Sequence, residues 1–145
     1  MILIIDFGSQ VTQLIARRIR ELNVYCEIIP WDVDITKTIS ITNAKGIILS
    51  GGPESTRIKK SPSVSKKIFD FNIPVLGICY GHQLICKILG GKISKSDKRE
   101  FGKTIIRRNN RTQSTLLKGL FKKNLEEVWM SHGDAVTEIP KGFVE

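Results

Sequence analysis

One cysteine lies in the pattern that most directly suggests chemistry. Cys79 is the centre of the segment Gly77-Ile78-Cys79-Tyr80-Gly81, which joins an apolar, strand-like run to an amphipathic, helix-like stretch. Glycines on both sides of a nucleophile permit the sharp strand-to-helix turn that exposes its side chain, because bulkier neighbours would clash there. The thiol would also face the positive end of the helix dipole, which favours the thiolate. A buried structural cysteine at a glycine-rich turn is the alternative, and the spacing favours a nucleophile.

A second glycine-rich segment follows another apolar run. In Leu49-Ser50-Gly51-Gly52-Pro53 the two glycines let backbone amides approach a ligand closely. Such a loop is a weak indication by itself, because glycine turns often end strands. Beside a nucleophile on a neighbouring strand it gains weight, since the amides of Gly52 and Tyr80 would together form an oxyanion hole next to Cys79.

A general base for the thiol has to come from one of only two histidines. His82 lies three residues after Cys79 on the same expected helix, where it would struggle to reach back over the thiol. His132 lies in the late segment Trp129-Met130-Ser131-His132-Gly133-Asp134. A Cys–His pair activates the thiol, so the residues alone nominate His132 as the base.

Short apolar runs alternate with amphipathic stretches, which predicts one α/β domain with a mostly parallel, open sheet and helices on both faces. Strands are expected at Ile2–Asp6, 25–29, Gly46–Leu49 and 75–78, and helices after Ser9, at 63–71 and at 81–89. Later residues change in texture and predict shorter strands, some of them antiparallel, at 92–96, 103–108, 128–131 and 135–139.

Composition narrows the class of protein. The chain has 145 residues, 41% of them hydrophobic, and a formal net charge of +9. Its basic clusters lack interleaved aromatic residues that would stack on bases, so nucleic acid is not an expected partner. The apolar runs are too short to cross a membrane, and three unpatterned cysteines indicate neither disulfides nor a zinc site. A reducing cytoplasm is the expected location.

Several segments together resemble the class I glutamine amidotransferases. The Gly-x-Cys-x-Gly-x-Gln element around Cys79 is shared across that family, and two further segments favour the branch that serves a purine-nucleotide synthetase over the anthranilate and carbamoyl-phosphate synthase branches. The matching segments are Asp6-Phe7-Gly8-Ser9-Gln10, Ile48 to Ser55, Gly77 to Gln83, Glu100-Phe101-Gly102 and Val128 to Asp134. The resemblance implies a flavodoxin-like amidotransferase fold that is incomplete over residues 1–145, with an ATP-dependent synthetase domain absent.

The resemblance also implies the roles of individual residues. Cys79 would attack the side-chain amide of L-glutamine, and the amides of Gly52 and Tyr80 would hold the oxyanion. The amino-acid end of glutamine would be bound by Gln83, Ser131, His132 and Gly133. That assignment replaces His132 as the base. Ammonia would pass to a synthetase domain or subunit that uses ATP and magnesium to aminate xanthosine monophosphate, and no cofactor is implied for this chain.

The sequence departs from the family at the catalytic base. The family base is a histidine in a His-Pro-Glu motif, and the 145 residues contain no such motif. The chain alone is therefore expected to hydrolyse glutamine poorly or not at all. Two other hypotheses remain open: a glutamine-binding or interaction module without catalysis, and a thiol-dependent hydrolase or redox sensor that uses the same cysteine turn. The glycine loop, Gln83 and the 131–134 segment favour glutamine over the last.

Overall fold

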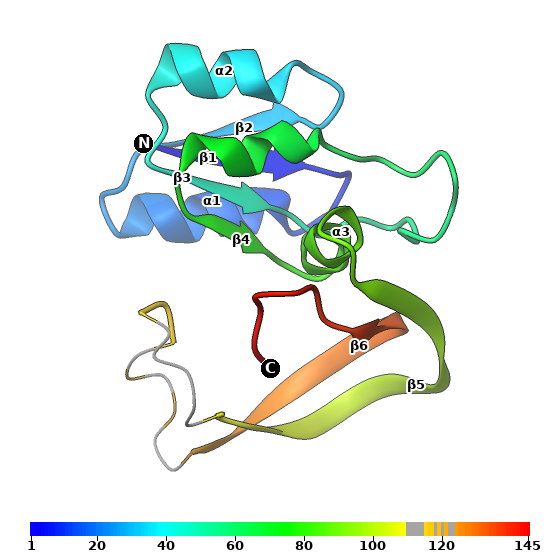
Figure 1. Ribbon diagram of the computed structural model, residues 1–145. Helices are drawn as coiled ribbons and strands as arrows, with labels where there is room; N and C mark the ends of the chain where they lie inside the picture. The colour runs from blue at the N-terminus through cyan, green and yellow to red at the C-terminus, as the bar shows by residue number, and fades with distance from the viewer. Residues whose placement is uncertain (110–114, 118, 120, 122–123) are drawn as a thin grey trace.

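A four-stranded parallel sheet forms the centre of the molecule, in the order β2-β1-β3-β4 (Figure 1). The computed structural model describes residues 1–109, 115–117, 119, 121 and 124–145, with only the backbone of 96–101 and 132. The strands are β1 (Ile2–Asp6), β2 (Cys26–Pro30), β3 (Gly46–Leu49) and β4 (Val75–Gly77). All four run in one direction, so their carboxyl ends lie at one edge of the sheet.

Helices cover both faces of this sheet because its central strands are apolar on both faces. Helix α1 (Thr12–Glu21) packs Ala16 against Ile4 on one face. On the opposite face Leu3 and Ile5 share a core with helix α2 (Ile35–Thr42), the 3-10 helix η1 (Lys66–Phe71) and helix α3 (Tyr80–Ile88). Helix α3 follows β4 almost directly, which places its N-terminus at the carboxyl edge of the sheet.

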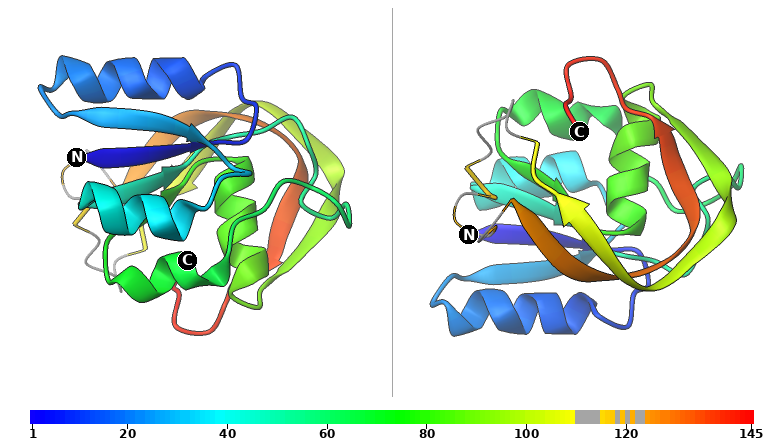
Figure 2. Two further views of the ribbon diagram at one scale, coloured as in Figure 1. Left: turned by 90° about the horizontal axis from the view of Figure 1, so that it is seen from above. Right: turned by 90° about the horizontal axis from the view of Figure 1, so that it is seen from below.

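The remaining strands form a separate antiparallel hairpin. Strand β5 (Lys92–Arg107) pairs with β6 (Leu125–Glu138) in a two-stranded sheet, with register shifts between Lys92 and Ile93 and between Lys95 and Glu100. In both views of Figure 2 the two strands curve side by side past α3. In the part of the chain that the structure describes, no helix is long and apolar enough to cross a membrane.

The expected α/β class, with a parallel sheet between helices, is confirmed, and several details differ. The antiparallel strands do not extend the parallel sheet, and the four short strands expected there are two long ones, because register shifts let each strand bend without ending. The stretch 63–71 is a 3-10 helix over Lys66–Phe71 only. Ser9 does not cap α1: its hydroxyl accepts from the Val11 amide, and Val11 is the N-cap residue.

Helix α2 was not expected from the sequence. Its residues are mostly β-branched and favour a strand by propensity. A local cap and burial outweigh that preference: the Asp34 carboxylate accepts from the Lys37 amide at 3.1 Å, and Ile35 and Ile39 bury one helical face in the core. The hydrogen bonds to Asp34 also lower the pKa of its carboxyl group.

Candidate active site

Cys79 lies on a strained turn between β4 and α3. Its backbone has φ 53° and ψ −107°, a left-handed conformation that a non-glycine residue adopts only where its surroundings enforce it. Two glycines make the turn possible. A Cβ on Gly77 would lie 2.6 Å from the amide nitrogen of His82, and one on Gly81 would lie 2.2 Å from the carbonyl oxygen of Leu49. The turn therefore requires glycine at both places, as the spacing predicted.

Hydrogen bonds fasten this turn to the end of β3. The amide of Ile78 donates to the Leu49 carbonyl at 2.9 Å, and the amide of Gly81 donates to the Ser50 carbonyl at 3.0 Å. Cys79 is exposed at the N-terminus of α3, between these two bonds. A helix N-terminus favours a negative charge, so the position suits a thiolate.

The loop after β3 is packed as closely as the turn. Ser50 is fully buried; its hydroxyl accepts from the Phe7 amide at 3.2 Å and donates to the Gly51 carbonyl at 2.9 Å. A Cβ on Gly52 would lie 2.9 Å from the Phe7 carbonyl oxygen. The Tyr80 ring lies 5.2 Å from that of Phe7, and the Tyr80 hydroxyl donates to the Pro62 carbonyl. Burial raises the pKa of Tyr80, which keeps this donor protonated.

A cavity of about 390 Å³ opens beside Cys79 where these elements meet the hairpin. Six of the seven residues that the sequence analysis selected line it: Gly52, Cys79, Tyr80, Gln83, Ser131 and Gly133. The seventh is His132, whose backbone lies in β6 opposite Glu100 and whose side chain is outside the described residues. Residues from β6, far away in the sequence, thus form one wall of the same cavity as the cysteine.

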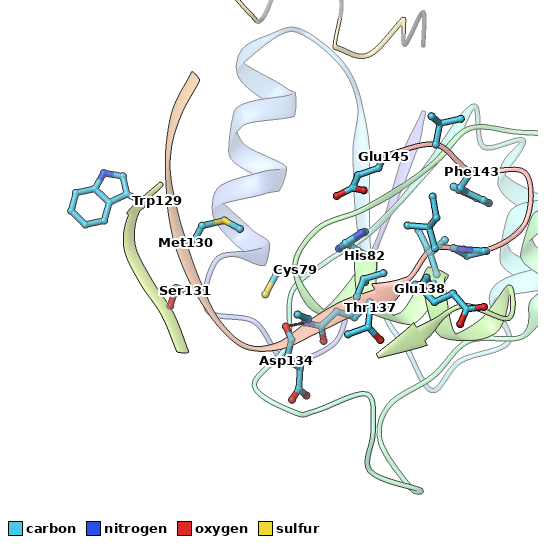
Figure 3. A pocket seen from close by; sticks show the side chains of 18 residues that line it. Cys79, His82, Trp129, Met130, Ser131, Asp134, Thr137, Glu138, Phe143 and Glu145 are labelled. Carbon is cyan, nitrogen blue, oxygen red and sulfur yellow. Dashed lines mark hydrogen bonds between the residues drawn. The ribbon is translucent and has the colours of Figure 1, made fainter. Parts of the chain in front are cut away.

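Cys79 also lines a larger cavity of about 1190 Å³ between α3 and β6 (Figure 3). His82, Gln83, Met130 and Ser131 contribute to its walls. In Figure 3 the indole of Trp129 points away from the cysteine, in keeping with its 76% exposure. The thiol lies at the boundary of the two cavities and is open to both.

Three residues outside the expected site connect its walls. The carboxylate of Asp134 accepts hydrogen bonds from the Ser55 hydroxyl and from Arg57 Nε, the latter at 3.0 Å. The backbone carbonyl of Asp134 accepts from Gln83 Nε2, also at 3.0 Å. Sequence reasoning missed the roles of Ser55 and Arg57 because nearly 80 residues separate them from Asp134, and no short-range pattern carries such a contact.

The other two cysteines differ from Cys79 in their surroundings. Cys26 is 1% exposed and Cys86 3% exposed. The Cys86 thiol donates to the Glu138 carbonyl at 3.5 Å, and burial, followed by the charge of Glu138, raises its pKa. Both thiols are thereby kept neutral and out of contact with solvent.

Magnesium was expected only for a synthetase, and the residues here offer it no site. Among the described side chains no group of three or more His, Cys, Asp or Glu residues is placed to hold a metal ion. The site geometry is that of a cysteine turn, a glycine loop and a facing strand.

Comparison with known proteins identifies the class. The model of the family described as glutamine amidotransferase class-I matches residues 3–145. The chain belongs to this family. A GMP synthase subunit from Thermoplasma acidophilum, known from its crystal structure, is 33% identical with a TM-score of 0.78, and the match covers 97% of this chain and 68% of the relative. A glutamine amido transferase from Methylobacillus flagellatus is 18% identical with a TM-score of 0.69; the match covers 98% of this chain and 58% of the relative, and it supports the fold alone.

Within the family, the chain is homologous to the glutamine-hydrolyzing GMP synthases. The enzyme of Clostridium tetani is 54% identical over 143 residues, which is 99% of this chain and 27% of the relative. That of Phenylobacterium zucineum is 52% identical over 146 residues, 98% of this chain and again 27% of the relative. The chain thus spans about a quarter of the length of these relatives and corresponds to their N-terminal amidotransferase region.

Proposed function

We propose that this chain is the glutaminase part of a GMP synthase, in which Cys79 releases ammonia from L-glutamine. The observation that carries the proposal is the cavity of about 390 Å³, which gathers Cys79 with Gly52, Tyr80, Gln83 and the β6 residues Ser131 and Gly133. Homology to the GMP synthases supports glutamine as the ligand.

The proposed reaction begins with attack of the Cys79 thiolate on the side-chain amide carbon of glutamine. The amides of Gly52 and Tyr80 donate to the oxyanion of the tetrahedral intermediate. The carbon–nitrogen bond then breaks, ammonia leaves with the proton that the thiol gave up, and a glutamyl thioester remains on Cys79. Water hydrolyses the thioester to glutamate and regenerates the thiol, so one glutamine and one water give one glutamate and one ammonia.

The ammonia serves a synthetase in this proposal. A synthetase domain or separate subunit, with ATP and magnesium, uses it to aminate xanthosine monophosphate to GMP in purine biosynthesis. Residues 1–145 are then part of the amidotransferase domain, and the ATP and magnesium sites belong to the synthetase. The cytoplasm is the compartment in which these partners meet, and neither nucleic acid nor a membrane takes part.

One specific observation favours a second candidate function, a glutamine-binding module that does not turn over. The sequence has two histidines and neither lies in a His-Pro-Glu motif. His82 lines the larger cavity together with Cys79, and the residues alone nominated His132. Without a base to return a proton, the chain would bind glutamine and stop before complete turnover.

Protection of Cys79 tests the binding step that both candidates share. Brief alkylation followed by peptide mass spectrometry gives the rate of Cys79 modification with and without L-glutamine. We expect L-glutamine to slow that rate in a saturable manner and D-glutamine to have little effect. No protection by L-glutamine, or equal protection by the two enantiomers, would contradict the proposed function.

Hydroxylamine separates an enzyme from a binding module. It attacks a thioester to give a hydroxamate, so a glutaminase that reaches the acyl-enzyme forms glutamyl hydroxamate from glutamine. Hydroxamate formation that disappears in Cys79→Ala supports the nucleophile. Saturable protection without any hydroxamate supports the binding module.

A further inference from the structure

We propose that Asp134 is a positioning residue, which sets the affinity of the smaller cavity for glutamine by fastening the loop after β3 to strand β6. The inference rests on the proposed function, since it concerns the same cavity. It assigns to Asp134 no contact with the reacting atoms.

The carboxylate of Asp134 holds two residues of one loop. The Ser55 hydroxyl donates to Oδ2, and Arg57 Nε donates to Oδ1 at 3.0 Å. The Asp134 side chain is only 12% exposed, whereas that of Arg57 is 43% exposed. All three residues line the cavity of about 390 Å³. The ion pair therefore closes the wall of the cavity at a place where water is partly excluded, which strengthens a charged hydrogen bond.

The residue between these two is held from the opposite direction. Thr56 is fully buried, and its carbonyl accepts from Lys87 Nζ on helix α3. Three consecutive loop residues are thus bound alternately by β6 and by α3. A loop fixed in this way gives Gly52 and Pro53, which precede it and line the same cavity, a defined position.

The backbone of Asp134 fixes a third wall of the cavity. Its carbonyl accepts from Gln83 Nε2 at 3.0 Å, which holds the Gln83 side chain against β6. Asp134 consequently joins the loop after β3, helix α3 and strand β6, the three elements that enclose the cavity. Loss of the carboxylate would release the loop and leave this backbone contact in place.

The turn that carries the thiol is fastened by other bonds. Cys79 is held by the hydrogen bonds from Ile78 to Leu49 and from Gly81 to Ser50, none of which involves Asp134. A change at Asp134 should therefore alter the binding of glutamine and leave the intrinsic reactivity of the thiol unchanged. A purely structural role would change both together.

The test compares Asp134→Asn with a matched control on the same hairpin, Glu127→Gln. Glu127 forms an ion pair with Lys103 at 2.8 Å with both side chains 58% exposed, and neither residue lines the two cavities. The measurement is Cys79 alkylation in the 145-residue chain, with and without L-glutamine. It yields an unprotected rate and a half-protecting glutamine concentration.

We expect Asp134→Asn to raise the half-protecting concentration roughly fivefold to twentyfold, a range between exposed ion pairs and buried charged hydrogen bonds. Its unprotected alkylation rate should stay within about twofold of the unmodified chain, and Glu127→Gln should change neither quantity. Arg57→Lys, which keeps the charge, should weaken protection less than Arg57→Ala. If Asp134→Asn does not fold, the Arg57 pair of variants gives the same comparison.

An unchanged half-protecting concentration in Asp134→Asn would overturn the inference, as would an equal loss in Arg57→Lys and Arg57→Ala. A parallel rise of the unprotected rate would indicate a structural role and would overturn it too. Failure of L-glutamine to protect the unmodified chain would instead contradict the proposed function. The two failures are therefore distinguishable.

Discussion

Replacement of Gly81 by alanine would add a methyl group at the point where α3 touches β3. The new carbon would lie 2.2 Å from the carbonyl oxygen of Leu49 and 2.7 Å from its carbonyl carbon. These atoms belong to a strand paired on both sides, by β1 and by β4, so they cannot rotate away. Overpacking a core costs about 1–3 kcal/mol, and a rigid backbone contact places this variant near about 3 kcal/mol.

At this chain length about 1 kcal/mol corresponds to about 2–4 °C in melting temperature, so Gly81→Ala should melt about 6–12 °C lower. Circular dichroism during heating measures the change. The control is Gly133→Ala, because a Cβ at Gly133 meets nothing within 4 Å and its φ is not left-handed. If Gly81→Ala melts within about 2 °C of Gly133→Ala, the close approach of α3 and β3 is wrong, and with it the geometry assigned to the cysteine turn.

Three further predictions concern the thiols and the loop after β3. Under brief alkylation of the folded chain Cys79 should react well before Cys26 and Cys86, because those two are almost fully buried, and equal labelling of the three by mass spectrometry would contradict this. Burial raises the pKa of Cys86 above its ordinary 9.0, so its contribution to stability is complete below about pH 9 and is lost as the pH rises through the folded-state pKa. The melting temperature should accordingly fall above pH 9, and Cys86→Ala should show a smaller fall; identical pH profiles would refute the reasoning. Ser50→Ala should lower the free energy of unfolding by about 1–3 kcal/mol in a urea titration, because the buried Phe7 amide loses its acceptor, and a change within error would show that water replaces it.

The parallel sheet could be predicted from the sequence because its signals are local. Strands β1 and β3 are short apolar runs bounded by turn residues, and their observed bounds, Ile2–Asp6 and Gly46–Leu49, match the expectation. Helix α2 could not be predicted in the same way, since its β-branched residues favour a strand and only tertiary burial of Ile35 and Ile39 decides the outcome. The hairpin was seen as fragments because bends at register shifts interrupt the alternation that a strand pattern needs.

The candidate site divides along the same line. The turn around Cys79 and the glycine loop each lie within a few residues of sequence, and their close contacts require glycine, so residue spacing was sufficient. Which wall faces the cysteine depends on the fold, and the contact of Ser55 and Arg57 with Asp134 spans nearly 80 residues. The roles proposed for Gln83, Ser131, His132 and Gly133 came from the family resemblance, and they remain predictions.

The hairpin has a consequence for the order in which the molecule comes apart. It belongs to a sheet of its own and shares no backbone ladder with the parallel sheet. Side-chain bonds join it to the rest, including Gln83 to Asp134 and Cys86 to Glu138. Such an attachment opens at a lower free energy than a continuous sheet does, so the hairpin can detach while the parallel sheet stays folded. Amides of β6 would then exchange hydrogen with solvent sooner than those of β1, and the cavity would vanish before the fold does.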